Sequence, residues 1–455
     1  MLLLFELSKR IIRLDKHLNE TDLIFSLVGC SGGEKQMFNE EELKTRSIQM
    51  AVEMAEGSFE NVVKDFAKEI AKQLDQQSLE VAWKQTSGEL GSYKTVNSSA
   101  FIQKGEKASV EIVLLYEKNG LKVTFMYDKN NKIEGLWLNY ASPEQPLAET
   151  KEYKEEAVKI GEGEMQVDGR LTLPKNVKNP PVVILVQGSG QTDMDETIGA
   201  QGNKPFQDIA YGLAEKGIAS IRYNKRYYQH PKLATEFVAI QGDVLNDVDL
   251  AIALANQDKR LNSDRIYILG HSLGGMLAPE IAYRNEHVSG IIVLAGTPRK
   301  LEDVILQQNK DAVNAMTDKT EQEKTAILEP VIQEIEKIRQ TTPESQHTII
   351  LGVNSEYWAS LNQIDTPEIL KEITIPMIIL QGEEDFQISM KDDFQMWHQL
   401  LDERENVEFK SYKGLNHLFM TSNGLKNIQE YNVKSKVEAI VINDISIWIK
   451  ENQER

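Results

Sequence analysis

Two hydrophobic patterns follow each other along the chain. Residues 40–75 carry apolar residues at helical spacing among many Glu and Lys residues, which predicts helices. Four runs of alternating apolar and polar residues come next, separated by short turns that contain Gly or Asn, as in an antiparallel meander. These runs are SYKTVNSSAFIQ, ASVEIVLLYE, LKVTFMYD and KIEGLWLNY. Helices followed by a meander predict a small α+β domain over residues 41–145.

The pattern changes after a polar, proline-containing stretch at 141–156, which we expect to be a linker. From there, short and continuous apolar runs suit strands that are buried on both faces, and helices are predicted between them. The clearest runs lie at 181–187, 265–270, 290–296 and 376–382. Alternating strands and helices predict an α/β domain over 146–455, with a mostly parallel sheet covered by helices.

Residues 300–372 interrupt this alternation with a highly charged stretch of helical periodicity, so we expect an all-helical insertion. Both of its ends adjoin predicted sheet strands, and open α/β sheets bind ligands at the carboxyl ends of their strands. The insertion is therefore expected to form a helical cap over the site. Tyr357 and Trp358 within it would either line a substrate pocket or pack the cap, and the sequence favours neither role.

Composition narrows the partners and the kinds of site. The chain has 51 Lys and Arg residues against 70 Asp and Glu residues, a net charge of −19, which disfavours nucleic acid as a partner. Its one cysteine, Cys30, cannot form an intramolecular disulfide or a cysteine-ligated zinc site. No apolar run approaches the roughly 20 residues that span a bilayer.

The surroundings of Cys30 resemble the lipobox of bacterial lipoproteins. Leu27, Val28 and Gly29 precede the cysteine, and a Ser/Gly-rich stretch that suits a flexible tether follows it. Basic residues lie upstream, as a signal peptide requires: Lys9, Arg10, Arg13 and Lys16. We therefore expect a signal-like segment at 1–30, a linker at 31–40, and a lipid anchor at Cys30 on the outer side of a bacterial membrane.

A second interpretation of this segment stays open. The apolar stretch before Cys30 is short for an export signal, and Glu20 and Asp22 stand where it should continue. Residues 1–30 would then be an ordinary N-terminal helix with a buried cysteine, in a cytoplasmic protein.

Candidate chemistry centres on the sequence ILGHSLGGM. Ser272 stands between Gly270 and Gly274, after a predicted buried strand and before a predicted helix. A Gly-x-Ser-x-Gly motif in a strand–turn–helix context is typical of the nucleophile turn of serine hydrolases. The amide of Leu273, at the start of the helix, would point toward the oxyanion that forms during acyl transfer.

A serine nucleophile needs a histidine base, which in this fold follows it in the sequence. Of the three candidates, His347 lies within the insertion and His398 on an amphipathic helix, so both are expected at the surface or in packing. His417 follows a short predicted strand and a glycine turn, which places it on a loop at a strand end. We therefore expect His417 to be the base.

The acid that orients the base is expected in the loop after the strand at 376–382. This loop offers Glu383, Glu384 and Asp385, of which Asp385 is best spaced to turn back across the sheet, with Glu384 as the second choice. The second oxyanion donor should come from the loop after the strand at 181–187. Its small residues favour the amide of Ser189, followed by that of Gly190.

Three longer stretches resemble a particular group of proteins: 185–226, 268–282 and 294–308. They are similar to bacterial carboxylesterase-like lipoproteins of the α/β-hydrolase superfamily, related to serine aminopeptidases and carrying an N-terminal domain of unknown function. The resemblance implies the α/β-hydrolase fold and a triad of Ser272, Asp385 and His417, without metal or cofactor. Such sequences usually have His where this chain has Gln187, which puts the shape of the oxyanion loop in doubt.

The sequence therefore predicts a serine hydrolase that cleaves carboxylic esters through an acyl-enzyme, with a small-molecule ester as its substrate. An aminopeptidase or acyl-peptide hydrolase would use the same triad, and a non-catalytic, surface-binding lipoprotein is the alternative from another class. Basic residues at 222–226 either meet an acidic group of the substrate or form ion pairs with Asp193, Asp195 and Glu196. The ion-pair interpretation is favoured.

Overall fold

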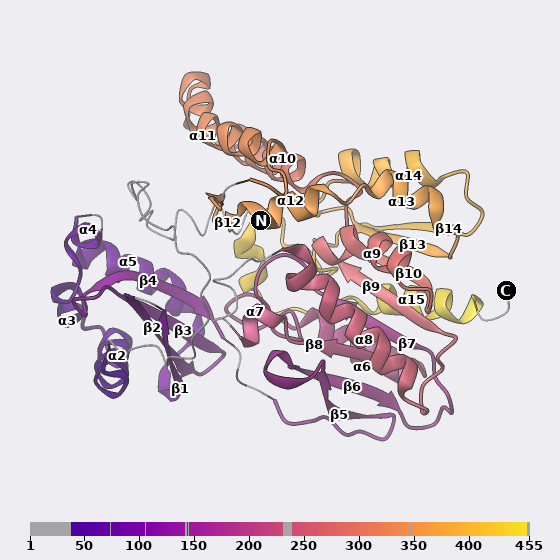
Figure 1. Cartoon of the computed structure of the whole chain (residues 1–455), viewed down its shortest axis with the longest axis horizontal. Helices are drawn as coiled ribbons and strands as arrows, with labels where there is room; N and C mark the ends of the chain where they lie inside the picture. The colour runs from indigo at the N-terminus through magenta and orange to yellow at the C-terminus, as the bar shows by residue number, and fades with distance from the viewer. Residues whose placement is uncertain are drawn as a thin grey trace.

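The computed structural model describes residues 38–452 of the chain, except 73, 105, 142, 144, 231–238 and 346. The predicted signal-like segment, with Cys30, lies outside the described residues. Figure 1 shows two parts side by side, a small N-terminal one in indigo and violet and a larger one that contains the rest of the chain. The two parts have separate sheets and largely separate hydrophobic cores.

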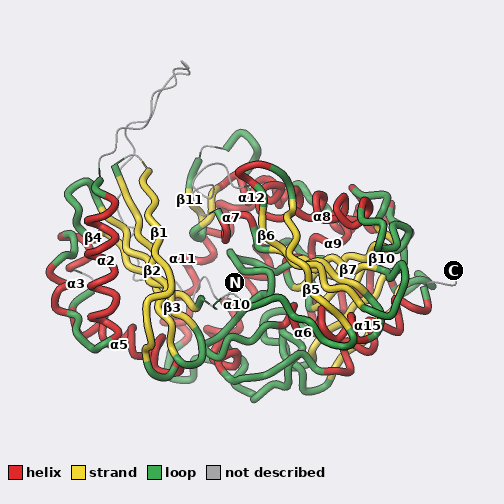
Figure 2. Tube along the Cα trace, turned by 90° about the horizontal axis from the view of Figure 1, so that it is seen from below, coloured by secondary structure: helices red, strands yellow, loops and turns green. Residues whose placement is uncertain are grey.

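The N-terminal part packs four helices against one face of a four-stranded antiparallel sheet (Figure 2). Its strands follow one another in the order β1-β2-β3-β4, as the meander pattern predicts. Alternate residues of β2 and β3 are buried against the helices, which is the period of two expected of a half-buried sheet. The elements are α2 (Glu40–Ala55), α3 (Glu60–Lys64), α4 (Lys68–Ala71), α5 (Gln76–Ser87), β1 (Tyr93–Lys104), β2 (Lys107–Tyr116), β3 (Gly120–Tyr127) and β4 (Ile133–Tyr140).

The larger part is built on an eight-stranded sheet in the order β14-β13-β10-β9-β7-β8-β6-β5. The strands from β14 to β8 are parallel, and β6 runs antiparallel to both of its neighbours. The central strands are buried at every residue, which explains their continuous apolar runs. The strands are β5 (Tyr153–Ile160), β6 (Val167–Pro174), β7 (Val182–Val186), β8 (Ala219–Tyr223), β9 (Ile266–His271), β10 (Val288–Leu294), β13 (Met377–Gly382) and β14 (Val407–Tyr412).

Helices cover both faces of this sheet and form two hydrophobic clusters. On one face lie α8 (Asn246–Gln257), α9 (Leu273–Arg284), α13 (Thr366–Glu372) and α14 (Gln395–Leu401). On the other lie α6 (Pro205–Glu215) and α15 (Ala439–Glu451). A short helix, α7 (Arg226–Gln229), follows β8. The predicted fold class, an α/β-hydrolase preceded by a small α+β domain, is confirmed.

The insertion after β10 is not all-helical, in contrast to the prediction. It contains α10 (Leu301–Asn314), α11 (Glu321–Arg339) and α12 (Ser355–Asn362), but also a hairpin of β11 (Ile349–Ile350) and β12 (Val353–Asn354). The two turn residues of the hairpin, Leu351 and Gly352, both have positive φ, of 49° and 77°. Such a turn suits the twist of a tight hairpin, and β-branched residues flank it. Figure 1 shows α10, α11 and α12 together at the top of the larger part.

The predicted end of the linker at 141–156 is wrong, because β5 already begins at Tyr153. The sequence pattern did not single out β5 or β6, since charged residues interrupt the apolar ones in both strands and leave neither a continuous apolar run nor a regular alternation. Among the residues that the structure describes, no helix combines the length and apolarity needed to cross a bilayer.

Candidate active site

Ser272 lies on the turn between β9 and α9, as the motif predicts. Its backbone has φ 54° and ψ −115°, and its amide donates to the carbonyl of Leu294 on β10 at 2.9 Å. The flanking glycines are required by close approach, because a Cβ at Gly270 would lie 2.1 Å from the carbonyl oxygen of Gly274. A Cβ at Gly274 would lie 2.2 Å from the carbonyl oxygen of Val186 on β7. A left-handed serine is strained, and such strain is found at nucleophile turns.

The loops after β13 and β14 bring the candidate acid and base together. His417 Nδ1 lies 2.7 Å from Asp385 Oδ2, and both side chains are almost completely buried. The other carboxyl oxygen of Asp385 accepts the amides of Gln387 and Ile388, at 2.7 and 3.0 Å. Gln381 on β13 donates to Asp385 Oδ2 at 2.9 Å. Asp385 thus accepts from four donors and presents one oxygen to His417.

The two glutamates that precede Asp385 point elsewhere. Glu383 accepts a hydrogen bond from Ser411 at the end of β14, and Glu384 forms an exposed ion pair with Lys426. His347 lies beside Glu356 at the surface, and His398 contacts Asp402 on α14. Of the candidate bases and acids, the structure therefore joins only His417 and Asp385.

Burial sets the protonation state of His417. It lowers the pKa of the imidazole below the ordinary value of 6.5, and the attraction of the Asp385 carboxylate offsets this only in part. The imidazole is consequently neutral at pH 7. A neutral imidazole whose Nδ1 proton is held by a carboxylate has a lone pair on Nε2 and can accept a proton there.

His271 links the loop of His417 to the turn that carries Ser272. Its Nε2 lies 3.0 Å from the carbonyl oxygen of His417, and the two rings are 4.7 Å apart between centroids. Its Nδ1 lies 2.9 Å from Glu196 Oε2. Burial lowers the pKa of His271, but the Glu196 carboxylate and the carbonyl of His417 outweigh burial, so the net shift is upward. The sequence analysis gave His271 no role, although it directly precedes Ser272 in the motif, and expected Glu196 to pair with the basic residues at 222–226 instead.

The loop at 187–190, here called the oxyanion loop, lies against the nucleophile turn. A Cβ placed on Gly188 would come within 3.1 Å of the Cβ of Ser272. The amide of Gly188 donates to Glu196 Oε1 at 2.7 Å. The candidate oxyanion donors are therefore the next two amides along the loop, those of Ser189 and Gly190. Gly190 has φ 95°, a conformation that favours glycine. Across from the loop, Leu273 is the first residue of α9, where backbone amides lack helical partners.

Gln187, the departure from the resembling sequences, contacts β8 at the start of this loop. Its side chain is buried, and its amide donates to the backbone carbonyl of Tyr223 at the end of β8. The residue therefore ties the start of the oxyanion loop to the neighbouring strand.

Tyr357 and Trp358 belong to the hydrophobic cluster that joins the insertion after β10, the predicted cap, to the sheet of the larger part. Trp358 Nε1 donates to the carbonyl of Ile350 at 2.9 Å, and the two aromatic rings meet edge to face, 5.8 Å apart. These are packing contacts within the cap. A contact with substrate stays a prediction for both residues.

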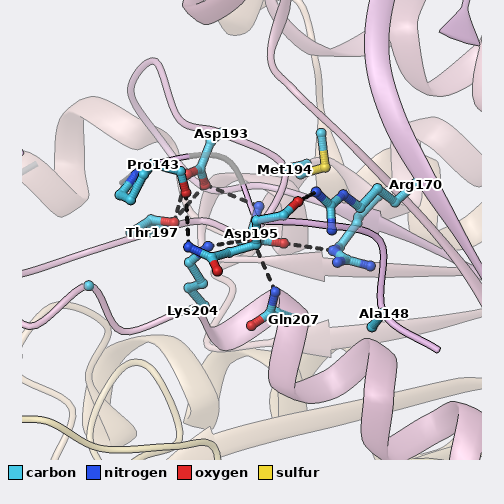
Figure 3. Close-up of polar contacts among 12 residues, drawn as sticks. Pro143, Ala148, Arg170, Asp193, Met194, Asp195, Thr197, Lys204 and Gln207 are labelled. Atoms are coloured by element: carbon cyan, nitrogen blue, oxygen red, sulfur yellow. Dashed lines mark hydrogen bonds and ion pairs between the residues drawn. The ribbon is translucent and has the colours of Figure 1, made fainter. Parts of the chain in front are cut away.

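The basic residues at 222–226 form buried ion pairs, as favoured, but of the predicted partners only Asp195 pairs with one of them. Arg222 is fully buried between Asp195, at 2.7 Å, and Glu155, at 2.5 Å. Lys225 pairs with Asp243, and Arg226 pairs with Asp247. Asp195 also accepts a hydrogen bond from Lys204 at 3.0 Å, as Figure 3 shows. Asp193 instead accepts the backbone amides of Asp195 and Thr197 in its own turn.

Comparison with known proteins gives two family matches. Residues 49–136 match a model described as a protein of unknown function (DUF3887), and residues 203–423 match one described as serine aminopeptidase, S33. The second match includes Ser272, Asp385 and His417.

A curated relative covers most of the chain. Esterase EstD of Thermotoga maritima is 31% identical over 396 residues, which are 86% of this chain and 92% of that protein. Among solved structures, Est1E from Butyrivibrio proteoclasticus has a TM-score of 0.42 at 15% identity and covers 66% of this chain and 99% of its own. An esterase of Pyrococcus furiosus has a TM-score of 0.41 at 12% identity, covering 66% and 91%.

Proposed function

The chain belongs to the carboxylesterase-like α/β-hydrolases with an N-terminal DUF3887 domain, and we propose that it hydrolyses carboxylic esters at Ser272. Family membership makes the protein a serine hydrolase of the carboxylesterase type. The residues of the reaction are the proposal, and the buried His417–Asp385 pair beside the nucleophile turn is the observation that carries it.

In the first half of the reaction, Ser272 Oγ attacks the acyl carbon of the ester while its proton passes to Nε2 of His417. Asp385 stabilises the imidazolium that forms, since its carboxylate already lies 2.7 Å from Nδ1. The carbonyl oxygen becomes an oxyanion, to which the amides of Leu273 and Ser189 donate, with Gly190 as the alternative to Ser189. When the C–O bond to the alcohol breaks, the alcohol takes the proton from His417 and the acyl-enzyme remains.

In the second half, a water molecule takes the place of the alcohol. His417 accepts one of its protons as its oxygen attacks the acyl carbon, and a second oxyanion forms in the same position. The bond to Ser272 then breaks, Ser272 regains its proton from His417, and the carboxylic acid leaves. Every proton in this cycle moves through one lone pair of His417, which the low pKa of the buried imidazole keeps available at neutral pH.

The test is substitution of the nucleophile. Ser272→Ala should abolish both the hydrolysis of p-nitrophenyl esters and covalent labelling by a fluorophosphonate, while the fold stays intact because the turn needs only a small side chain. Ser289, which lies at the start of β10 and donates to the backbone of Asp264, offers a matched control, and Ser289→Ala should leave both readouts unchanged. Labelling that persists in Ser272→Ala would refute the assignment.

The same triad would cleave an aminoacyl amide, and the serine aminopeptidase match over residues 203–423 keeps this alternative open. A panel of p-nitrophenyl esters and aminoacyl anilides separates the two activities. Faster turnover of the anilides would replace the esterase with an aminopeptidase. Absence of turnover on the whole panel, together with failure to label Ser272, would favour a non-catalytic binding protein.

We propose further that Cys30 carries a lipid anchor on the outer face of a bacterial membrane. The residues before Cys30 and the Ser/Gly-rich stretch after it support the proposal. Labelling of cells with a palmitate analogue should depend on the cysteine and be lost in Cys30→Ala. Equal labelling of the two proteins, or a mature mass that includes residues 1–29, would instead place the protein in the cytoplasm.

A further inference from the structure

Glu196 occupies a position that the proposed reaction does not use. It is buried, and its backbone is left-handed with φ 53°, a conformation that glycine adopts far more readily than glutamate. The turn around it is built by Asp193, whose Oδ1 accepts the amides of Asp195 and Thr197 and whose Oδ2 accepts Thr197 Oγ1 at 2.6 Å (Figure 3). The chain thus holds a charged side chain in a strained position at the edge of the candidate site.

The two carboxyl oxygens of Glu196 contact two different parts of the candidate site. Oε1 accepts the amide of Gly188 in the oxyanion loop at 2.7 Å, and Oε2 lies 2.9 Å from Nδ1 of His271 in the nucleophile turn. The other ring nitrogen of His271 contacts the backbone carbonyl of His417. One side chain therefore joins the oxyanion loop, the nucleophile turn and the backbone of the base.

We propose that Glu196 is a positioning residue of the oxyanion hole. Its carboxylate fixes the direction of the Gly188 amide, and this orients the following peptide, whose amide belongs to Ser189, toward the acyl oxygen. Through His271 it also fixes the distance between the oxyanion loop and the base. The inference rests on the proposed function, because it assumes that Ser272 is the nucleophile and that the loop at 187–190 provides an oxyanion donor.

Such a role makes a specific kinetic prediction. An oxyanion forms only in the transition state, so a misplaced donor lowers kcat and leaves KM for the ground-state ester almost unchanged. Loss of one oxyanion donor typically costs about 100-fold or more in kcat. A tetrahedral mimic that bonds to the serine, such as an alkylboronic acid, should lose affinity in parallel with kcat.

The variants separate the contacts of Glu196 from its charge. Glu196→Ala removes both contacts, whereas Glu196→Gln can keep them, with its carbonyl accepting from Gly188 and its NH2 donating to Nδ1 of a neutral His271. Glu196→Asn suits the left-handed backbone but is one methylene too short to reach both partners. Glu430→Gln is the matched control, because Glu430 is equally buried and accepts a backbone amide, that of Asn423, outside this set of contacts.

The experiment measures kcat and KM for a short-chain p-nitrophenyl ester, the dissociation constant of the boronic acid, and thermal unfolding, all on the full chain. We expect Glu196→Ala and Glu196→Asn to lose about 100-fold in kcat and in boronate affinity, with KM within about threefold of wild type. Glu196→Gln should retain kcat to within about tenfold, and Glu430→Gln should match the wild type. If Glu196→Ala does not fold, Glu196→Asn carries the same comparison.

The inference would be overturned by a folded Glu196→Asn or Glu196→Ala protein with kcat near wild type, or by a loss that falls on KM instead of kcat. Equal losses in Glu196→Gln and Glu196→Ala would also overturn it, because charge alone would then explain the effect. Failure of the proposed function is distinguishable, since the wild type itself would then neither hydrolyse the ester nor be labelled at Ser272.

Discussion

Replacing Asp385 by Asn changes only the chemistry of one buried group, because the two side chains have the same shape. In the structure the carboxylate accepts four donors: His417, Gln381 and the amides of Gln387 and Ile388. An asparagine oriented with its NH2 toward His417 faces two of these donors with a donor of its own. With the opposite orientation, its NH2 faces the two backbone amides instead.

The magnitude follows from this geometry. Because the two backbone amides are rigid, we expect the asparagine oxygen to stay with them and its NH2 to donate to Nδ1 of His417. The histidine then carries its proton on Nε2 and cannot accept the proton of Ser272. Loss of the working tautomer typically lowers kcat by about 10⁴-fold, as in the serine protease case, which corresponds to roughly 5.5 kcal/mol in activation free energy.

Steady-state hydrolysis of a p-nitrophenyl ester measures this loss, and the rate of fluorophosphonate labelling should fall with it. Glu384→Gln is the control: it neutralises the adjacent residue, whose exposed ion pair with Lys426 lies apart from the base, and should retain wild-type kcat. An Asp385→Asn enzyme that kept kcat within about tenfold of wild type would refute the assignment of Asp385 as the orienting acid.

Three further outcomes are expected. The acid limb of kcat/KM should lie below pH 6.5, because burial lowers the pKa of His417 and activity is lost only when the pH falls below that pKa; a limb above pH 6.5 in a pH–rate profile would contradict this. Arg222→Met should cost about 3–5 kcal/mol in the free energy of unfolding, measured with urea, because it removes the fully buried cation that Glu155 and Asp195 share and leaves each carboxylate with one partner, Arg170 and Lys204 respectively. Gly188→Ala should lower kcat more than it raises KM, since its Cβ would lie 3.0 Å from Glu196 Oε1 and 3.1 Å from the Cβ of Ser272; unchanged kinetics would show that the oxyanion loop can shift freely.

Sequence patterns predicted the parts of the fold that rest on local repetition. Continuous apolar runs marked β7, β9, β10 and β13 because these strands are buried on both faces, and alternation marked the meander. The strand β5 escaped because half of its residues are charged, as is common at the edge of a sheet, and they follow no regular alternation. The hairpin in the cap escaped because two residues per strand are too few to establish a period.

The candidate site likewise contains residues that sequence patterns point to and residues that they miss. The sequence could single out Ser272 and the loops of Asp385 and His417 as candidates because each follows a recognisable strand, and the order along the chain restricts the choice. Glu196 could not be found in this way. Its partners, Gly188 and His271, lie close to it only in the folded chain. Its positive φ is also not evident from the sequence, because glycine is the residue expected in that conformation and this position carries glutamate.

The residues that follow Glu196 also connect the two parts of the molecule. Ala200 is fully buried in the hydrophobic cluster of the N-terminal part, and the side chain of Asn119 donates to the carbonyl of Gly199. No side chain would fit at Gly199, since a Cβ there would lie 1.9 Å from the carbonyl oxygen of Tyr431. The segment from Glu196 to Ala200 is therefore fixed at one end by the oxyanion loop and at the other by the N-terminal part. Docking of the N-terminal part and the geometry of the oxyanion loop thus depend on the same five-residue stretch of chain.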